Sequence, residues 1–445
     1  MSANKNKFNS WRDYQRRHRK IIREKHYLHG TQWLGLCAGG LFLILIIVFY
    51  TGPWIFAHLE QQNDPALKTA EPERKETDQL FKQDLPDLLK HVDLDETPPS
   101  GTYFIEREGK TFALETSLDP TLQNYIRNLL RRSQTYKAAV IVMRPGTGQI
   151  LAMVHYENHG TGGGENLCLK ADFPAASLFK IISAAAALES RGFTPEKALE
   201  FRGRKHTLYK SQLRKGKSRY TVKTSLKKAF SRSINPVFGR IGIYDLGKEV
   251  MSDYAERFWF NRKIPFDLPL DESSIQVPDD DFGLAEIASG FNKRTLISPL
   301  HAALITAAVA NQGIMMEPWL VRQVSDESGK TLYRSKPLRL GQPITAKTAK
   351  DMRILMMETV KSGTSRKAFR RLRRKKAFKN IELGAKTGTI NDKLDQYKFD
   401  WMTTYALPKK GDDGVSAAVL AVHGEMLGIR ARDIARYVID FHFNS

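Results

Sequence analysis

A serine and a lysine three residues apart, Ser177 and Lys180, stand at the start of an apolar segment that runs to Leu188. A spacing of three residues places both side chains on one face of a helix. An amine kept neutral by burial and by neighbouring cations can act as the base for an adjacent hydroxyl, and the N–H groups of a helix N-terminus can stabilise an oxyanion. The pair alone is weak evidence of catalysis, because the same spacing occurs at ordinary helix starts.

Two further motifs could complete a site with this pair. Ser233-Ile234-Asn235 begins 56 residues after Ser177, and Lys386-Thr387-Gly388-Thr389 begins 153 residues after Ser233. The three motifs together fit serine acyl transfer. The first offers a serine with its lysine, the second a Ser and Asn pair that relays a proton and holds a substrate amide, and the third a cationic strand edge that binds a carboxylate. Each motif is common by itself, but the ordered set of three favours this chemistry over chance.

The elements that must position these motifs alternate between helix and strand. Asp119-Pro120 predicts a helix start, and the apolar residues that follow it fall on one helical face. Two β-rich runs joined by a Pro-Gly turn predict an antiparallel hairpin, and three more runs and a closing helix follow near the C-terminus. The predicted strands are 137–143, 149–155, 381–386, 400–406 and 416–422, and the closing helix is 429–440.

A long insertion separates the second and third of these strands. Helical patterns fill it, notably at 177–190, 298–311 and 346–360. We therefore predict an α/β fold with an antiparallel five-stranded sheet, flanked by helices, and an all-helical insertion.

One segment near the N-terminus has the length and composition of a membrane-spanning helix. Residues 31–57 carry no charge and have Trp33 at one end and Trp54 at the other, where aromatic rings meet the membrane interfaces. Residues 1–30 hold nine Lys or Arg and two acids, whereas residues 58–100 hold five and eleven. The positive-inside rule then places the N-terminus in the cytoplasm. The apolar run is longer than that of a cleavable signal peptide, so we expect an uncleaved single-pass anchor.

The formal net charge of +22 predicts an anionic partner. Two stretches concentrate the cations without any acid: residues 201–244 hold thirteen Lys or Arg and residues 361–379 hold ten. A solvated face and an anion-binding rim beside the cleft are both open interpretations. Nucleic acid would suit such stretches in a cytoplasmic protein, but export argues against it. The two cysteines, Cys37 and Cys168, exclude a disulfide framework and a cysteine-based zinc site.

From about Leu114 to the C-terminus the chain resembles the penicillin-binding proteins, the serine D,D-transpeptidases that cross-link peptidoglycan, in a monofunctional, class B-like form. The resemblance rests on the three motifs above and on several supporting stretches. These are Thr116–Gln123, Gly148–Met153, Gly283-Leu284-Ala285, Ser298-Pro299-Leu300, Ala310–Gly313, Ser362-Gly363-Thr364, Asp400-Trp401 and Tyr405.

The charge and hydropathy pattern and the resemblance together divide the chain into four sections, and the resemblance implies a bacterial location. These are a basic cytoplasmic arm (1–30), the anchor in the inner membrane (31–57), a linker or small pedestal (58–112) and a periplasmic transpeptidase domain (113–445). The stretch between the anchor and Leu114 is too short for a glycosyltransferase domain, so a separate glycan polymerase is the expected partner. Peptidoglycan stem peptides, β-lactams and the membrane are the other expected partners, and no nucleic acid is expected.

The resemblance also implies a role for each motif residue. Ser177 would be acylated by a D-Ala-D-Ala stem peptide, with Lys180 as its base, and an acceptor amine would then form the cross-link. Ser233 would relay a proton to the leaving amine, Asn235 would bind the donor peptide, and Lys386 would support Ser233. The N–H groups of Ser177 and Thr389 would form the oxyanion hole, with no metal or cofactor required. The expected substrate-binding residues are Thr387, Gly388 and Thr389.

Departures from the family pattern keep other activities open. Pro174-Ala175-Ala176 replaces the usual Pro-Gly before the serine, Ala385 stands where glycine often precedes the lysine, and Met402-Thr403-Thr404 replaces the usual Phe-Val-Gly. A D,D-carboxypeptidase or endopeptidase is the main alternative. A β-lactamase, for which Glu272 or Asp279–Asp281 would have to serve as the deacylating carboxylate, and a non-catalytic β-lactam sensor are less favoured.

Overall fold

The centre of the domain is a five-stranded antiparallel sheet. In the computed structural model, which describes residues 79–444 apart from 95, 108, 159–164, 217 and 412–413, its strand order is β13-β14-β15-β3-β4. All five predicted strands are confirmed, and β13 and β14 extend further than predicted. The bounds are β3 (Lys137–Met143), β4 (Ile150–Glu157), β13 (Ile381–Asn391), β14 (Lys398–Pro408) and β15 (Val415–His423).

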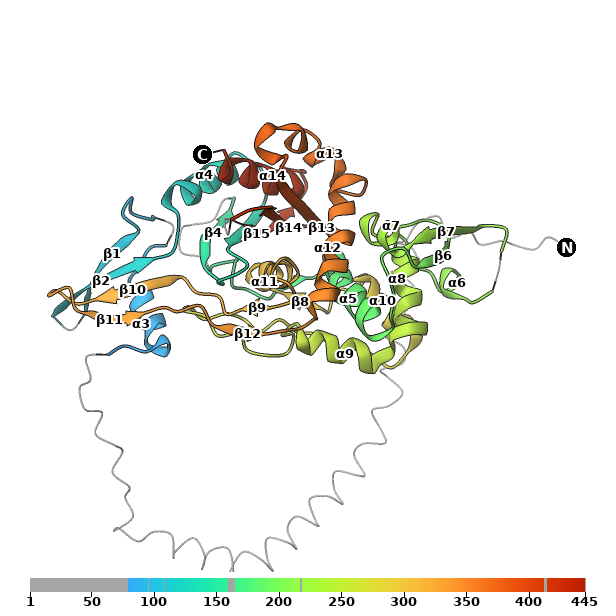
Figure 1. Cartoon of the computed structure of the whole chain (residues 1–445), viewed down its shortest axis with the longest axis horizontal. Coiled ribbons are helices and arrows are strands. Elements are labelled where there is room, and N and C mark those ends of the chain that lie inside the picture. The colour runs from blue at the N-terminus through green and yellow to red at the C-terminus, as the bar shows by residue number, and fades with distance from the viewer. Residues whose placement is uncertain are drawn as a thin grey trace, which may run out of the picture. The chain divides into compact units, whose positions relative to one another are not determined.

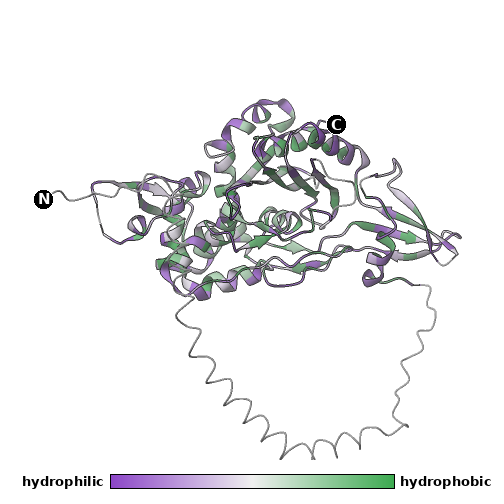
Figure 2. Cartoon of the chain, turned by 180° about the vertical axis from the view of Figure 1, so that it is seen from behind, coloured by the Kyte–Doolittle hydropathy of each residue, from purple (hydrophilic) through white to green (hydrophobic). Residues whose placement is uncertain are grey.

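Helices cover both faces of this sheet (Figure 1). One face packs against α4 (Pro120–Arg131) and α14 (Ala431–His442), and the other packs against α11 (Pro299–Ala310). Successive residues of β3 serve the two layers, because Val140 belongs to the α4 and α14 core whereas Ile141 belongs to the α11 core. Figure 2 shows the consequence, with hydrophobic colour on the inner strands and hydrophilic colour on the outer faces of the helices.

The insertion between β4 and β13 is not all-helical, which corrects the sequence prediction. Its described residues include eight short strands beside the helices. Each strand spans two to five residues, too few alternations for a periodic pattern to separate it from a loop. The strands are β5 (Phe173–Pro174), β6 (Ala198–Arg202), β7 (Thr221–Ser225), β8 (Leu296–Ile297), β9 (Met315–Met316), β10 (Val321–Ser325), β11 (Thr331–Arg334) and β12 (Arg339–Gly341).

The predicted long helices of the insertion are present. The one predicted at 177–190 begins as the 3₁₀ turn η3 (Ala176–Phe179) and continues as α5 (Lys180–Ser190), and the one at 346–360 is α12 (Ala346–Lys361). The others are α6 (Lys210–Leu213), α7 (Leu226–Ser231), α8 (Asn235–Ile241), the π-helical segment η4 (Gly242–Leu246), α9 (Gly247–Arg257), α10 (Asp281–Ser289), α13 (Arg366–Phe369), η5 (Leu372–Arg374) and η6 (Lys376–Phe378).

A second sheet, ordered β1-β2-β10-β11, joins the early part of the described chain to the insertion. β1 (Thr102–Arg107) and β2 (Lys110–Thr116) form a hairpin, and β2 pairs with β10 through contacts such as Leu114 with Val324. The expected boundary between residues 112 and 113 thus falls inside β2. From η2 (Lys82–Asp84) and α3 (Leu85–Leu89) onward, the section expected as a linker or pedestal is folded against this sheet.

A buried carboxylate holds the second sheet to the body of the domain. Asp267 is fully buried, and its Oδ2 accepts the backbone N–H groups of Leu320 at 2.6 Å and Val321 at 2.7 Å. The Lys82 ammonium lies 3.4 Å from its Oδ1. One side chain therefore serves three groups from two distant parts of the chain.

Replacing this carboxylate tests its structural role. Asp267→Ala leaves two buried N–H groups without an acceptor, so we expect a loss of about 2–4 kcal/mol in the free energy of unfolding. Urea denaturation measures the loss. Asp279→Ala removes an exposed carboxylate that pairs with Lys248 at the surface, and its midpoint should stay that of the parent. Equal midpoints for both variants would contradict the role given to Asp267.

No helix within residues 79–444 combines the length and the apolar character needed to cross a bilayer. The predicted anchor at 31–57 and the basic arm at 1–30 lie outside the described residues, so both remain sequence-based predictions.

Candidate active site

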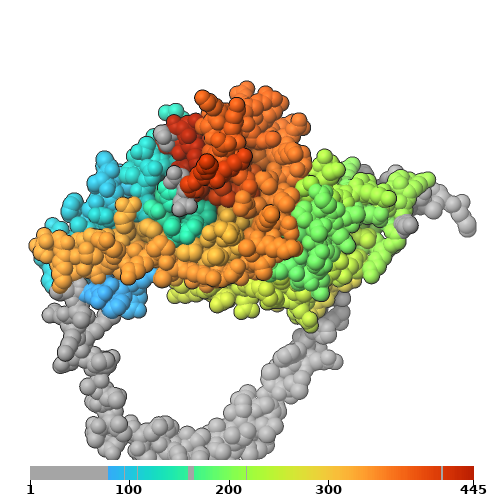
Figure 3. Space-filling view, in the orientation of Figure 1, coloured from blue at the N-terminus to red at the C-terminus, as the bar shows by residue number. Residues whose placement is uncertain are grey.

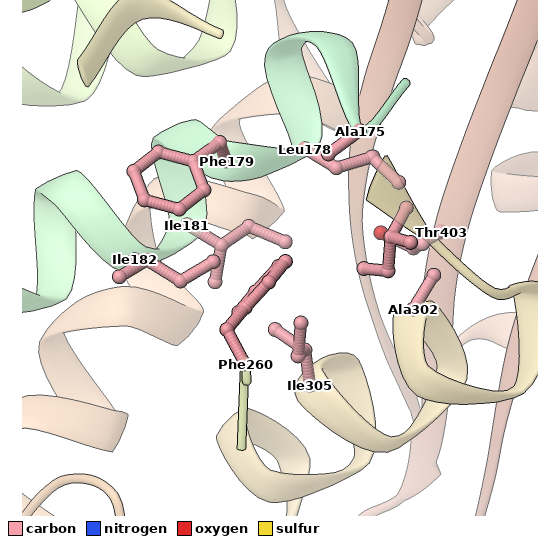
Figure 4. Close-up of a pocket in the computed structure, with 10 residues that line it drawn as sticks. Ala175, Leu178, Phe179, Ile181, Ile182, Phe260, Ala302, Ile305 and Thr403 are labelled. Carbon is pink, nitrogen blue, oxygen red and sulfur yellow. The ribbon is translucent and has the colours of Figure 1, made fainter. Parts of the chain in front are cut away.

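Ser177 lies in the 3₁₀ turn η3, which packs against a layer of apolar side chains. Leu178, Phe179 and Ile182 face Phe260 and neighbouring apolar side chains of α11 (Figure 4). The Phe179 and Phe260 rings meet edge to face, with centroids 5.9 Å apart. The sequence of this segment thus fixes the turn by burying three side chains and leaving Ser177 half-buried at its surface.

The backbone just before Ser177 is held by a side-chain hydrogen bond and is strained. The indole Nε1 of Trp401 donates a hydrogen bond of 2.9 Å to the carbonyl oxygen of Pro174. Ala176 adopts φ = 49°, a left-handed conformation that costs a non-glycine residue about 1–2 kcal/mol. The alanine at this position, where the family usually has glycine, therefore carries backbone strain next to the nucleophile.

The Lys180 amine is the centre of the site. It lies 2.9 Å from Ser177 Oγ and donates hydrogen bonds to Asn235 Oδ1 at 2.8 Å and to the carbonyl oxygen of Ser289, which leaves its lone pair for the Ser177 hydroxyl. The side chain is fully buried. Burial, and then the nearby charge of Lys386, lower the pKa of Lys180 well below its usual value. The amine is therefore prepared to accept the proton of the Ser177 hydroxyl.

Ser233 lies in a strained turn between α7 and α8, and Asn235 is the first residue of α8. Ser233 has φ = 52° and is buried. The Asn235 N–H donates to the carbonyl of Lys205 at 2.7 Å, and the Thr364 N–H donates to the carbonyl of Ser231 at 3.0 Å. The turn is therefore fixed from two sides, by the loop after β6 and by the turn after α12.

Lys386 lies on β13 and is fully buried. Its ammonium donates to Ser233 Oγ at 3.1 Å and to the carbonyl of Thr387 at 2.7 Å, and it lies 5.5 Å from the centre of the Phe230 ring. Burial lowers the pKa of Lys386 to about 7. Two buried amines, each bonded to one serine hydroxyl, thus stand on either side of the turn at Ser233 and Asn235.

The remainder of the strand motif lies against the nucleophile. A Cβ on Gly388 would be 3.4 Å from the Ser177 nitrogen and 3.3 Å from the Ala176 Cβ, so only a small residue lets β13 approach this closely. The Thr387 hydroxyl lies 2.7 Å from that of Thr364. The Thr389 hydroxyl donates to Asp400 Oδ1 at 3.2 Å.

A charged pair anchors this end of the strand. Arg430 donates two hydrogen bonds to Asp400, of 2.6 Å from Nε and 2.9 Å from Nη2. The Ala431 N–H donates a third at 3.0 Å. Burial opposes ionisation of Asp400, but the hydrogen bonds and the charge of Arg430 outweigh it and lower the pKa of Asp400. Asp400 therefore remains an anion that fixes the hydroxyl of Thr389.

The structure brings together all eight residues predicted for the site and adds some that the sequence did not reveal. The Ser289 acceptor is a backbone carbonyl, which leaves no signature in a sequence. Gly290 has φ = 61°, and a Cβ there would overlap the carbonyl of Ala176. His206 has its pKa lowered by partial burial and by the charges of Lys180 and Lys386, so it lies at the rim of the same site. The position of His206 after a basic run did not indicate in the sequence that it belongs to the site.

The family comparison agrees with this geometry. Residues 138–436 match the family model described as the penicillin-binding protein transpeptidase domain. The chain belongs to this family. The resemblance found in the sequence motifs is therefore confirmed, and the three motifs of this transpeptidase domain meet in one site as expected.

This penicillin-binding protein is similar in sequence to characterised members of the family. It is 23% identical over 355 residues to the peptidoglycan D,D-transpeptidase PbpA of Mycolicibacterium smegmatis, over 72% of this chain and 70% of that protein. It is 27% identical over 268 residues to the stage V sporulation protein D of Bacillus subtilis, over 57% of this chain and 40% of that protein. The chain thus spans between 40% and 70% of the length of these two relatives.

Solved structures share the fold. The imipenem acyl-enzyme complex of penicillin-binding protein A from M. tuberculosis superposes with a TM-score of 0.59 at 25% identity, over 74% of this chain and 78% of that chain. The D,D-transpeptidase domain of a peptidoglycan glycosyltransferase from Eggerthella lenta gives 0.59 at 22% identity, over 73% and 81%. The predicted transpeptidase fold is confirmed.

The close approach of Gly290 to the nucleophile turn predicts a local defect. In Gly290→Ala the Cβ would overlap the Ala176 carbonyl, which displaces Ser177, and we expect acylation by a β-lactam to slow about 100-fold or more. Gly192→Ala is the matched control, because Gly192 has φ = 62° but no atom within 4 Å of its Cβ position. The control should lose only about 1 kcal/mol of stability and keep its acylation rate. Equal rates in the two variants would contradict the proposed packing.

The two buried lysines predict a bell-shaped pH dependence of acylation. The rate should fall about tenfold per pH unit below the pKa of Lys180, because its amine becomes protonated, and again above about 7, because Lys386 loses its charge. Stopped-flow acylation by a chromogenic β-lactam measures the profile, and circular dichroism over the same range confirms that the fold persists. A rate that rises steadily to pH 10 would contradict the lowered pKa values.

Proposed function

We propose that this protein is a peptidoglycan D,D-transpeptidase that works through an acyl-enzyme on Ser177. The observation that carries the proposal is the Lys180 amine, which contacts both Ser177 Oγ at 2.9 Å and Asn235 Oδ1 at 2.8 Å. Ser177 Oγ attacks the carbonyl between the two D-alanines of a stem peptide, and Lys180 takes its proton. The C–N bond breaks and D-alanine leaves. The amine of a second stem peptide then attacks the ester, the new amide forms, and the Ser177 hydroxyl is restored.

The second lysine and serine complete the proton path. Ser233 relays a proton to the leaving D-alanine nitrogen, because its hydroxyl lies 3.1 Å from the Lys386 ammonium. The same ammonium provides the positive charge toward which the terminal carboxylate of the substrate is drawn. Asn235 holds the donor peptide through its side-chain amide, whose oxygen already accepts from Lys180.

The strand motif receives the substrate on its outer edge. β13 is the edge strand of the sheet, so its free backbone groups can pair with an extended peptide. Thr387 and Thr389 lie on one side of the strand and bind the carboxylate, while Gly388 allows the strand to lie beside Ser177. The N–H groups of Ser177 and Thr389 form the oxyanion hole.

The surroundings of the nucleophile favour transfer over rapid hydrolysis. Within the described part of the chain, no carboxylate hydrogen-bonds Ser177 or Lys180, whose partners are Asn235 and the Ser289 carbonyl. A fast β-lactamase needs a base that activates water for deacylation. The arrangement therefore fits a long-lived acyl-enzyme that waits for an acceptor amine.

The topology of the whole chain belongs to the same proposal. Residues 31–57 anchor the protein in the bacterial inner membrane as a single span, with residues 1–30 in the cytoplasm and the catalytic domain in the periplasm. A separate glycan polymerase supplies the strands to be cross-linked. The support is the uncharged apolar run at 31–57 and the charge asymmetry across it. Protease accessibility of the N-terminus in inside-out vesicles tests the orientation.

Covalent labelling tests the chemistry. After exposure to a fluorescent penicillin, we expect intact-mass spectrometry to show one adduct on the wild-type chain and none on Ser177→Ala. Lys180→Arg keeps a cation but cannot offer a neutral amine, so its acylation should slow about 100-fold or more. Product analysis with a stem pentapeptide and an acceptor amine then separates transfer from hydrolysis. An adduct that persists in Ser177→Ala, or unchanged acylation of Lys180→Arg, would contradict the mechanism.

A further inference from the structure

A strongly basic surface lies beside the catalytic cleft and takes no part in the mechanism above. We call it the basic platform. It comprises the exposed Lys and Arg side chains of α13, η5, η6 and the residues around them. They are Lys361, Arg366, Lys367, Arg370, Arg371, Arg373, Arg374, Lys375, Lys376 and Lys379. In Figures 1 and 3 this segment is orange and lies at the top of the molecule.

Nine of the ten platform cations form no ion pair with a described residue. The exception is Lys375, which pairs with Asp440 at 2.6 Å. Arg373 donates to the carbonyl of Lys361 at 3.5 Å. Elsewhere on the same domain arginines bind carboxylates through two hydrogen bonds, as Arg353 does with Glu382. Nine neighbouring cations therefore repel one another without neutralisation inside the fold.

The fold holds these like charges in place. Phe369, Leu372 and Phe378 are at most 3% exposed and pack into the core cluster that contains α14. The Phe378 ring meets that of Phe443 edge to face at 5.8 Å. Because the backbone between the cations is anchored at three buried positions, the segment cannot spread out to relieve the repulsion. A rigid arrangement of unpaired cations is suited to an anionic ligand.

A groove extends the platform toward the active site. Its volume is about 610 Å³. Its floor is apolar. Two carboxylates also line it: Glu382 is paired with Arg353, and Glu358 accepts a hydrogen bond from Ser362 Oγ. The groove cations are Lys227, Lys361, Arg373 and Lys379, and the apolar floor is Ile354, Met357, Val360, Phe378, Ile381 and Leu383.

The groove and the catalytic site share one strand. β13 enters the groove at Ile381–Leu383 and reaches Lys386 three residues later, about 10 Å along a strand. The turn that begins the platform also contacts the site, since Thr364 hydrogen-bonds Thr387. A ligand in the groove would therefore lie next to a peptide on the catalytic strand.

We propose that the basic platform and its groove form a second binding surface for the carboxylates of neighbouring stem peptides on the same peptidoglycan strand. This inference rests on the proposed function. Five of the ten cations are arginines, whose guanidinium forks match carboxylates, and the apolar floor suits the methyl groups of alanine. The spread of the cations over nineteen residues fits a polymer with repeated anions better than one small ion. The surface would favour polymeric substrate over a single stem peptide.

A lipid surface fits this region less well than a peptidoglycan strand. Membrane-binding surfaces combine cations with exposed large apolar side chains that enter the lipid. Every exposed large hydrophobic side chain of the described residues lies outside the platform, the nearest along the chain being Leu338 and Leu394. The platform therefore lacks the groups that would insert.

Binding to defined strands tests the proposal. The full-length chain carrying Ser177→Ala is mixed with fluorescent, uncross-linked peptidoglycan strands, so that binding is measured without acylation. Adding Arg370→Glu, Arg373→Glu and Arg374→Glu should weaken binding about tenfold or more. The matched control reverses three exposed lysines away from the platform, Lys110, Lys263 and Lys336, with the same change in net charge. Its affinity should stay within about twofold of the parent, because only local charges act through physiological salt.

Two further arms identify the ligand. Strands whose carboxylates have been converted to amides should bind the parent about tenfold more weakly, and monomeric stem pentapeptide should bind parent and variant alike. The proposal would be overturned if amidated strands bound as tightly as unmodified strands, or if the control variant lost as much affinity as the platform variant. Tighter binding to phosphatidylglycerol vesicles than to strands would also overturn it. If the triple variant does not fold, Lys376→Glu with Lys379→Glu replaces it.

The readouts separate this inference from the proposed function. The platform variant in the Ser177-containing background should be acylated by penicillin at the parental rate, because none of its changed residues touches Ser177. Failure of the parent to form an adduct would count against the transpeptidase assignment. Normal acylation together with undiminished strand binding would overturn only the platform.

Discussion

The burial of one amine governs this structure. Lys180 is fully enclosed, and each of its three hydrogen bonds ends on a group from a different part of the chain: Ser177 beside it, Asn235 at the start of α8 and the Ser289 carbonyl at the end of α10. An ionised lysine in such a place would be costly, and desolvation shifts it toward the neutral base. The α5, α8 and α10 helices thus exclude water from this amine and fix its orientation.

Two strained backbone positions and one glycine lie around that amine. Ala176 and Ser233 both adopt left-handed backbone conformations, and Gly290 supplies a third at the point where α10 touches the nucleophile turn. Each occupies a turn that must bring a functional group to Lys180 or Lys386. The surrounding core, with Trp401 bonded to Pro174 and the Phe179 and Phe260 rings in contact, provides the packing that keeps these turns in place. The second lysine repeats the principle, because Lys386 is equally buried and holds Ser233.

The sequence was sufficient for the parts of the fold that rest on local pattern. The β-rich runs 137–143 and 416–422 were correctly predicted as strands, and Asp119 was a correct helix cap because its carboxylate accepts the N–H groups of Thr121 and Leu122. It failed where stability is non-local. β2 is stabilised by pairing with β10, which no local pattern reveals, and the two-residue strands β5 and β9 exist only because of their partners.

The site divides in the same way. Motif order predicted that Ser177, Lys180, Ser233, Asn235 and Lys386 would come together, because each contributes its side chain to the site. The Ser289 carbonyl, the close approach of Gly290 and the position of His206 depend on how separate segments pack, so only coordinates could reveal them. The hydrogen bonds that Asp400 accepts from Thr389 and Arg430 were also not predicted from the sequence.

The most direct test of this account is the protonation state of Lys180. Selective ¹³C labelling of lysine side chains lets NMR follow each amine through a pH titration, and comparison with Lys180→Arg assigns the signal. The account predicts that the pKa of the Lys180 amine lies well below the usual value of about 10.4 and that the amine is neutral at the pH where acylation is fastest. A Lys180 signal that titrates near 10 would mean that the amine is charged during catalysis, and the base in this site would have to be another group.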